Sequence, residues 1–179
     1  MSRIDETKVF QPVNIAVLVV SDSRTEQTDK SGRTLAERIE RAGHHLIEKL
    51  IVPDEITEIQ SHVRRWIANV EVDVVIATGG TGLTGRDVTP EAFYELYDKE
   101  IPGFGELFRW TSFPRIGTST MQSRATAGVS SGTYLFAVPG SPGACRDAWD
   151  DILKWQLDSR HRPCNLVDIM PRLMEHKRA

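Results

Sequence analysis

Apolar residues in the first half of the chain form short continuous runs that alternate with stripes at helical spacing. The run 13–20 is rich in β-branched residues, which is typical of a strand covered on both faces. Residues 46–52 resemble a second strand, and 72–77 form a third, apolar one. Residues 31–42 and 54–70 instead place apolar side chains three and four positions apart, and this predicts helices. The second stripe consists of Ile56, Ile59, Val63, Trp66, Ile67 and Val70. Strands that alternate with helices predict an α/β domain whose crossovers lead onto a parallel sheet.

The second half predicts fewer elements. Pro90 after Thr89 predicts the start of a helix, and a further helix is expected over 101–113. A strand over 133–138 leads into a final helix over 141–157. Its apolar stripe consists of Cys145, Ala148, Trp149, Ile152, Leu153 and Leu157. The Ser/Thr/Gly-rich stretch 117–132 shows neither the helical nor the strand period of apolar residues, so no element is predicted there.

Composition and charge narrow the class of protein. The 179 residues suit a single domain, and a net charge of −3 argues against a generally basic nucleic-acid binder. From Arg160 onward, however, five basic residues stand against two acidic ones, a pattern more typical of a solvated face or a subunit contact than of an anion site. Two isolated cysteines and the absence of a long apolar run favour a cytoplasmic protein that binds neither membrane nor nucleic acid.

The most informative segment is Thr78-Gly79-Gly80-Thr81-Gly82, directly after the third predicted strand. With Gly85 it matches the dinucleotide fingerprint literally, but no helix begins at Gly85 and no strand ends in an acid about 20 residues later. It is not a P-loop either, because Arg86-Asp87 replaces Lys-Ser/Thr. What remains is a set of exposed N–H groups at the end of a parallel strand, where α/β sheets bind small polar or anionic molecules.

Two other loops follow predicted strands and offer similar donors. Ser21 and Asp22 come after the first strand, although a solvated loop is an equally good interpretation there. Pro139, Gly140 and Ser141 come after the last strand, and Ser141 is a candidate N-cap of the final helix. These loops are expected to line the same end of the sheet.

Asp54 and Asp87 are the candidate acidic residues of this site. Asp54 could instead cap the second helix, and Asp87 could form a loop ion pair with Arg86. Both, however, lie beyond the carboxyl ends of strands that we expect to be neighbours. Carboxylates that face a phosphate-binding loop would repel an anion unless a cation lay between them, so we expect Mg²⁺ there.

Several blocks of sequence resemble the molybdenum cofactor biosynthesis proteins of the MoaB/Mog family. The blocks are Val20-Ser21-Asp22-Ser23-Arg24, Thr78 to Gly82, Arg86-Asp87-Val88-Thr89-Pro90-Glu91-Ala92, Gly103 to Arg109, Ile116 to Thr120, Gln122-Ser123-Arg124-Ala125, Val138 to Ser141 and Arg162-Pro163-Cys164-Asn165. The likeness covers about residues 12–167. We therefore expect a flexible N-terminal arm over 1–11, the family's domain over 12–167 and a C-terminal tail over 168–179.

The resemblance implies a three-layer α/β/α fold with a mostly parallel sheet, assembled as a trimer or a dimer of trimers. It also implies a reaction in which molybdopterin and ATP, with Mg²⁺, give adenylyl-molybdopterin and pyrophosphate. The family's two functional aspartates correspond to Asp54 and Asp87, which would place Mg²⁺ and ATP, while the glycine loop would hold the pterin phosphate. The alternative is a binding protein of the same fold that holds a molybdopterin or a nucleotide without turnover, for storage, delivery or regulation.

Overall fold

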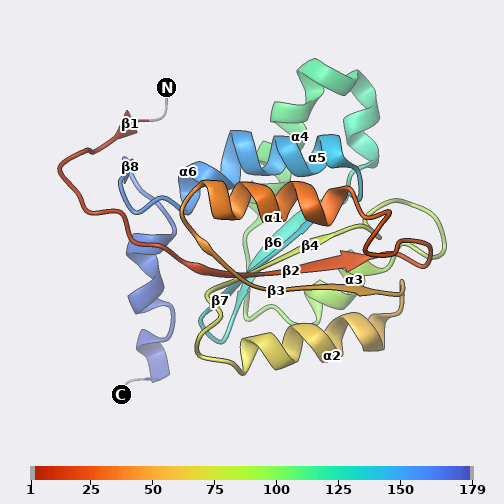
Figure 1. Cartoon of the computed structure of the whole chain (residues 1–179), viewed down its shortest axis with the longest axis horizontal. Coiled ribbons are helices and arrows are strands. Elements are labelled where there is room, and N and C mark those ends of the chain that lie inside the picture. Colours follow the sequence, from red (N-terminus) through yellow and green to blue (C-terminus); the bar gives the residue numbers. More distant parts are fainter. Residues whose placement is uncertain (1–2, 178–179) are drawn as a thin grey trace.

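A six-stranded sheet with helices on both faces forms the body of the protein, and the computed structural model describes residues 3–177 (Figure 1). The strand order is β3-β2-β4-β7-β6-β5. The first four strands are parallel and comprise His45–Val52 (β3), Asn14–Val20 (β2), Val74–Thr78 (β4) and Thr133–Val138 (β7). Thr126–Ser130 (β6) runs antiparallel to β7 and pairs with the short Lys99–Glu100 (β5). The predicted α/β class with a mostly parallel sheet is confirmed.

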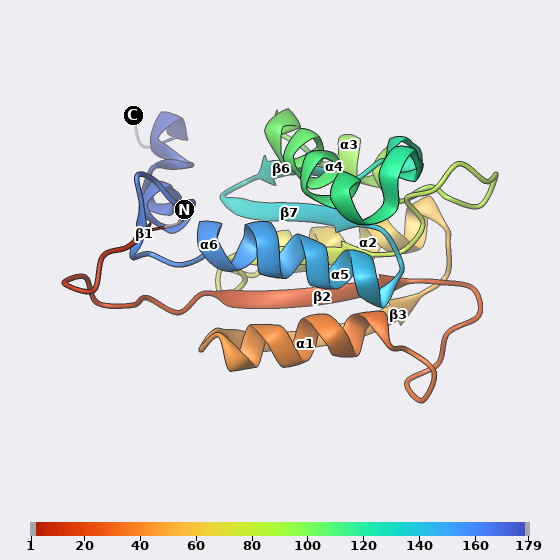
Figure 2. The same ribbon diagram turned by 90° about the horizontal axis from the view of Figure 1, so that it is seen from above.

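Alternate residues of each buried strand face opposite layers, because side chains along a strand alternate between its two sides. Ile15, Val17 and Val19 of β2 join the core beneath one helical layer, whereas Ala16, Leu18 and Val20 join the core on the other face. The first layer contains Ser31–Arg41 (α1), Pro102–Ile116 (α4) and Pro142–Asp147 (α5), and the second contains Ile56–Ile67 (α2) and Thr89–Tyr94 (α3) (Figure 2). Three layers are thus confirmed.

The final helix is continuous but not uniform. After α5 the chain passes through a π-helical segment, Ala148–Leu153, before Lys154–Gln156 (α6). All six residues of the predicted apolar stripe are buried. The earlier helix α2 is shorter than predicted, since it ends at Ile67 and leaves Val70 92% exposed. Assigning Val70 to the buried stripe was therefore wrong.

The stretch without a predicted element contains a 3-10 helix, Gly117–Gln122, followed by β6. Ser131 and Gly132, both with positive φ, then form the tight turn into β7. The sequence of β6 is Thr-Ala-Gly-Val-Ser, which has no alternation of apolar and polar residues. The strand is nevertheless largely buried, because α4, β7 and Tyr97 cover it. A Cβ at Gly128 would lie 2.3 Å from the Tyr97 ring, so the close approach of that ring requires glycine.

The N-terminal segment lies along the C-terminal one. Arg3–Ile4 (β1) pairs antiparallel with His161–Arg162 (β8), and Lys8 forms an ion pair with Asp168 at 2.8 Å. Two short 3-10 helices, Val167–Arg172 and Glu175–Lys177, complete the described tail. The arm and tail boundaries stay predictions. The basic excess is partly compensated within the chain, since Arg160, Arg162 and Arg172 pair with Asp158, Asp5 and Glu175.

Over residues 3–177, no helix is both long enough and apolar enough to cross a membrane. Both cysteines are free thiols, Cys145 buried and Cys164 exposed.

Candidate functional site

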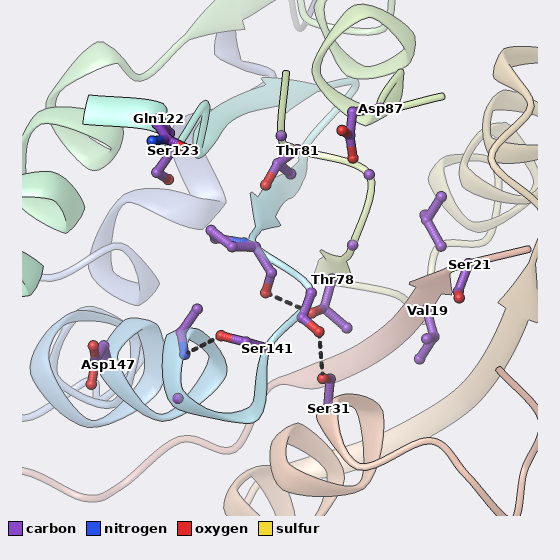
Figure 3. Close-up of a pocket in the computed structure, with 18 of the residues that line it drawn as sticks. Val19, Ser21, Ser31, Thr78, Thr81, Asp87, Gln122, Ser123, Ser141 and Asp147 are labelled. Atoms are coloured by element: carbon purple, nitrogen blue, oxygen red, sulfur yellow. Dashed lines mark hydrogen bonds between the residues drawn. The ribbon is translucent and has the colours of Figure 1, made fainter. Parts of the chain in front are cut away.

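A cavity of about 870 Å³ opens at the carboxyl ends of the parallel strands, where the loops after β2, β3, β4 and β7 converge (Figure 3). This is the place at which open α/β sheets bind ligands. The predicted binding residues that line it are Ser21, Thr78, Gly79, Gly80, Thr81, Gly82, Pro139, Gly140 and Ser141, together with Asp54 and Asp87. Asp22 does not line this cavity; it lies beside it and lines a shallower hollow formed by the loop after β2.

The glycine loop takes a backbone course that side chains would obstruct. Gly79 and Gly80 have φ of +107° and +61°, and a Cβ at Gly79 would lie 2.1 Å from the carbonyl oxygen of Val20. Thr89 holds the loop from α3, with its hydroxyl donating to Gly79 O at 2.8 Å and its N–H to Gly80 O at 2.9 Å. Among the described residues, the N–H groups of Gly80 and Thr81 have no hydrogen-bond acceptor, so they are available to a ligand.

Short contacts join the loop after β7 to Thr78, which precedes the glycines of the glycine loop, and to Ser31 of α1. The Thr78 hydroxyl donates to Pro139 O at 3.0 Å, and the Ser31 hydroxyl donates to Gly140 O at 2.9 Å (Figure 3). Ser141 Oγ accepts the Ala144 N–H at 3.1 Å, which confirms Ser141 as the N-cap of α5. These bonds fix two donor-rich loops side by side.

Asp54 does not cap α2, and that interpretation was wrong: the cap position is Glu55, whose side chain makes no capping bond. Asp54 borders the glycine loop instead, since a Cβ at Gly80 would lie 2.8 Å from Asp54 Oδ1. Burial, followed by the negative charges of Asp22 and Asp87, raises the pKa of the Asp54 carboxyl above its ordinary value. Asp54 follows β3 and Asp87 follows β4. We expected these two strands to be neighbours, but β2 lies between them.

Asp87 is not paired with Arg86, so the loop ion pair was also a wrong interpretation. Arg86 binds Asp22 through two hydrogen bonds of 3.0 Å and Glu55 at 2.7 Å. The Asp87 carboxylate accepts the N–H and the hydroxyl of Thr84 at 2.8 and 2.6 Å. Burial acts to raise the pKa of Asp87, but these donors outweigh it and the pKa is lowered.

Asp54 and Asp87 thus both line the cavity along one loop, Asp54 beside Gly80 and Asp87 beside Gly82, and the charge of Asp87 acts on the Asp54 carboxyl. Among residues 3–177, no three His, Cys, Asp or Glu side chains form a cluster that could hold a metal ion. Oxygen donors are nevertheless what Mg²⁺ prefers, and it commonly binds one or two carboxylates plus substrate phosphates. The two aspartates suit an ion that arrives with a phosphorylated ligand.

Sequence reasoning missed the basic side chains of the cavity, namely Arg24, Arg115 and Arg146. Arg115 is paired with Asp147 and Asp151, whereas Arg24 and Arg146 form no ion pair with any described residue. Proximity to the predicted loops was the available signal, since Arg24 follows Asp22 and Arg146 lies in the helix that Ser141 caps. The other missed lining residues are Val19, Val20, Ser23, Asp29, Ser31, Phe108, Ser112, Ile116, Ser119, Gln122, Ser123, Gly143, Ala144 and Asp147.

Comparison with known proteins gives a consistent result. A family model described as "Probable molybdopterin binding domain" matches residues 16–159. The molybdenum cofactor biosynthesis protein B of Escherichia coli K12 is 53% identical over 156 residues, which cover 87% of this chain and 92% of the relative. The protein of the same name from Bacillus subtilis 168 is 44% identical over 142 residues, covering 79% and 84%.

A solved structure agrees at the level of the fold. A crystal structure of a molybdenum cofactor biosynthesis protein B matches with a TM-score of 0.84 and 41% identity, over 94% of this chain and 99% of that one. The family model covers all four loops that meet at the cavity as well as both aspartates. The chain therefore belongs to the MoaB/Mog family of molybdenum cofactor biosynthesis proteins.

Proposed function

We propose that this protein binds molybdopterin and ATP with Mg²⁺ and forms adenylyl-molybdopterin and pyrophosphate. The observation that carries the proposal is that Asp54 and Asp87 line one cavity beside the glycine loop, Asp54 next to Gly80 and Asp87 next to Gly82. A protein that only bound an anion would gain nothing from two carboxylates there, because they repel the ligand's charge. At about 870 Å³ the cavity is also at the upper end of the range usual for small-molecule sites.

The chain's own groups suit a transfer that needs positioning and charge stabilisation more than covalent catalysis. In this reaction the pterin phosphate attacks the α-phosphorus of ATP, the bond from that phosphorus to the bridging oxygen breaks, and pyrophosphate leaves. The free N–H groups of Gly80 and Thr81 would hold a phosphate, and Arg24 and Arg146 would offset the charge of the polyphosphate. A bound Mg²⁺ would supply further charge neutralisation between the aspartates and the phosphate oxygens.

No cysteine of the cavity region suits nucleophilic catalysis. Cys145 lies beside Thr78, and burial raises the pKa of its thiol to about 11, so the thiol is protonated at neutral pH. Direct attack by the pterin phosphate needs no such group.

Turnover of molybdopterin with ATP and Mg²⁺, measured as released pyrophosphate and adenylylated pterin, tests the proposal. We expect Asp54→Asn and Asp87→Asn each to lower turnover by about 100-fold or more, as losing a transition-state electrostatic group does. Asp98→Asn is the matched control, because Asp98 is exposed and accepts the Ser131 N–H at the distant β6–β7 turn. A wild type that binds the pterin but releases no pyrophosphate would show that the protein stores, delivers or senses its ligand instead.

We also propose a homo-oligomer of three or six copies. The exposed side of α4 supports this, since Trp110, Phe113 and Ile116 are 74%, 53% and 51% exposed on one helix. Clustered apolar side chains of this kind commonly mark a protein contact. Sedimentation velocity should find a trimer or hexamer for the wild type and a smaller species for Trp110→Glu, whereas a monomeric wild type would exclude the assembly.

A further inference from the structure

The loop 82–88 that carries Asp87 is held at its base and free at its tip. Leu83 is 70% exposed, and a Cβ at Gly85 would meet no atom within 4 Å. Within the loop, Asp87 N–H donates to Thr84 O at 3.0 Å and the Asp87 carboxylate accepts from Thr84, so the turn is closed on itself. The position of this turn over the cavity must therefore be set by contacts from outside it.

Arg124 supplies those contacts from behind the loop. Its Nε donates to Gly82 O at 2.8 Å, its Nη2 donates to Asp87 O at 2.8 Å, and its Nη1 pairs with the carboxylate of Glu91 on α3. The Arg124 N–H also donates to Thr81 O at 3.3 Å. One guanidinium thus binds both ends of the loop and ties them to the helix behind it.

Arg124 does not line the ligand cavity. It lines a separate hollow of about 310 Å³ on the far side of the loop, among residues of α3, α4 and β6. The two carbonyl groups that it binds belong to Gly82 and Asp87, and both of these residues do line the cavity. Arg124 therefore acts on the site from outside the cavity, through the loop backbone that its hydrogen bonds hold and through its positive charge, which helps to lower the pKa of the Asp87 carboxyl.

The other arginine at this loop holds it less firmly. Arg86 binds Asp22 and Glu55, but the side chains of all three are about half exposed, at 55%, 47% and 52%. Exposed ion pairs contribute little because water screens them. The Arg124 side chain is only 29% exposed, and two of its bonds go to backbone carbonyls of the loop itself.

From this geometry we infer that Arg124 is a positioning residue that sets the placement of Asp87 and of the Gly82 end of the glycine loop. The inference rests on the proposed function for its effect on turnover, while its effect on the loop stands independently. Lysine cannot substitute, since one ammonium group cannot occupy the three positions that the planar guanidinium fills.

Amide hydrogen exchange of Arg124→Lys tests the effect on the loop. Three amides report on the loop, because each donates a hydrogen bond there: Thr84 to Asp87 Oδ2, Asp87 to Thr84 O and Thr89 to Gly80 O. We expect faster exchange at these three positions and unchanged exchange in the sheet. Arg38→Lys is the control. Arg38 forms an ion pair with Asp150 at 3.1 Å and does not line the cavity, so this variant should leave exchange of the loop amides unchanged. Unchanged loop exchange in Arg124→Lys would overturn the inference.

Steady-state kinetics and their Mg²⁺ dependence test whether the placement of the loop by Arg124 affects turnover. We expect kcat to fall about 10- to 100-fold in Arg124→Lys, with a higher Mg²⁺ concentration for half-maximal rate, as is usual when a supporting partner is lost. Faster loop exchange with unaltered kcat, KM and Mg²⁺ dependence would refute a role in the site.

Two further results keep the test decisive. If the wild type releases no pyrophosphate, the proposed function fails, but the inference can still be tested by calorimetric titration with Mg-ATP and with molybdopterin. Equal affinities of wild type and Arg124→Lys for these ligands would overturn the inference. If Arg124→Lys does not fold by circular dichroism, Glu91→Gln replaces it, because it removes the anchor on α3. Loop exchange that stays at the wild-type rate in Glu91→Gln would then count against the inference.

Discussion

The main-chain N–H groups of Asp22 and Asp54 each donate to the other residue's carboxylate, at N···O distances of 3.0 and 3.1 Å. This reciprocal pair joins the loop after β2 to the loop after β3, and Arg86 joins both to the loop after β4. Two like charges are thereby held close together beside the cavity. Burial and then the negative charge of Asp22 raise the pKa of Asp54, whereas the hydrogen bond from the Asp22 N–H acts to lower it.

The charge of Asp22 should therefore set the acidic limb of the pH–rate profile. Asp54 must be ionised to attract a cation, so turnover should fall as pH drops through its raised pKa. Asp22→Asn removes the neighbouring negative charge, lowers the pKa of Asp54 and should move that limb to lower pH. Pyrophosphate release measured across pH gives the limb. The exposed control Asp98→Asn should leave it in place, and an unmoved limb in Asp22→Asn would contradict the coupling.

Gly80 and Gly85 should respond oppositely to alanine. At Gly80 the φ of +61° and a Cβ 2.4 Å from Thr89 Oγ1 and 2.8 Å from Asp54 Oδ1 should cost about 1–3 kcal/mol of unfolding free energy and weaken ligand binding. At Gly85 the Cβ meets nothing within 4 Å, so Gly85→Ala should be neutral or stabilise by about 0.4–1 kcal/mol. Urea denaturation measures both variants. Equal stability of the two would contradict the steric argument.

Lys49 offers a comparison of a buried and an exposed partner. Its Nζ lies 3.1 Å from Asp29, whose side chain is 1% exposed, and 2.7 Å from Glu26, whose side chain is 62% exposed. Asp29 also accepts the Gly32 N–H at 2.8 Å. Asp29→Ala should therefore destabilise by about 3 kcal/mol, because it leaves the Gly32 N–H without its acceptor and the Lys49 ammonium with only its exposed partner. Glu26→Ala should cost less than about 1 kcal/mol in the same urea titration.

His44 should make stability depend on pH below neutrality. Its ring packs against Phe10 and Trp149, its Nδ1 accepts the Val13 N–H at 3.2 Å, and burial lowers its pKa to about 4. The unfolded chain then binds a proton more readily than the folded one. The contribution of neutral His44 is present above pH 6.5 and is lost as pH falls toward 4, by about 3 kcal/mol in all.

Urea unfolding of wild type and His44→Gln between pH 4 and 7 checks this, since glutamine can still accept the Val13 N–H. The stability of His44→Gln should fall less on acidification than that of the wild type. His176→Gln, at an exposed position near the C-terminus, should follow the wild type throughout. Parallel curves for wild type and His44→Gln would show that His44 does not titrate as argued.

Much of the fold could be predicted because its signals are local. The β-branched runs, the helical stripes and the N-cap Ser141 each depend on residues a few positions apart, and all appear in the structure. The strand β6 could not be predicted, since Thr-Ala-Gly-Val-Ser is buried by its neighbours and not by its own pattern. The same holds for the end of α4, where Arg115 and Ile116 line the cavity from beyond the predicted bounds 101–113 of that helix.

The sequence by itself determined the alternation of strands and helices in the first half of the chain, the glycine loop and the membership in a family. Only the tertiary structure decided that β2 separates β3 from β4, that Asp54 faces Gly80 instead of capping α2, and that Arg86 binds Asp22. The physical reason is distance along the chain: Asp22 and Asp54 are 32 residues apart, and Arg124 and Gly82 are 42 apart. Backbone propensity and periodicity act over single turns, whereas the partner of a charged side chain is chosen by the packing of the whole sheet.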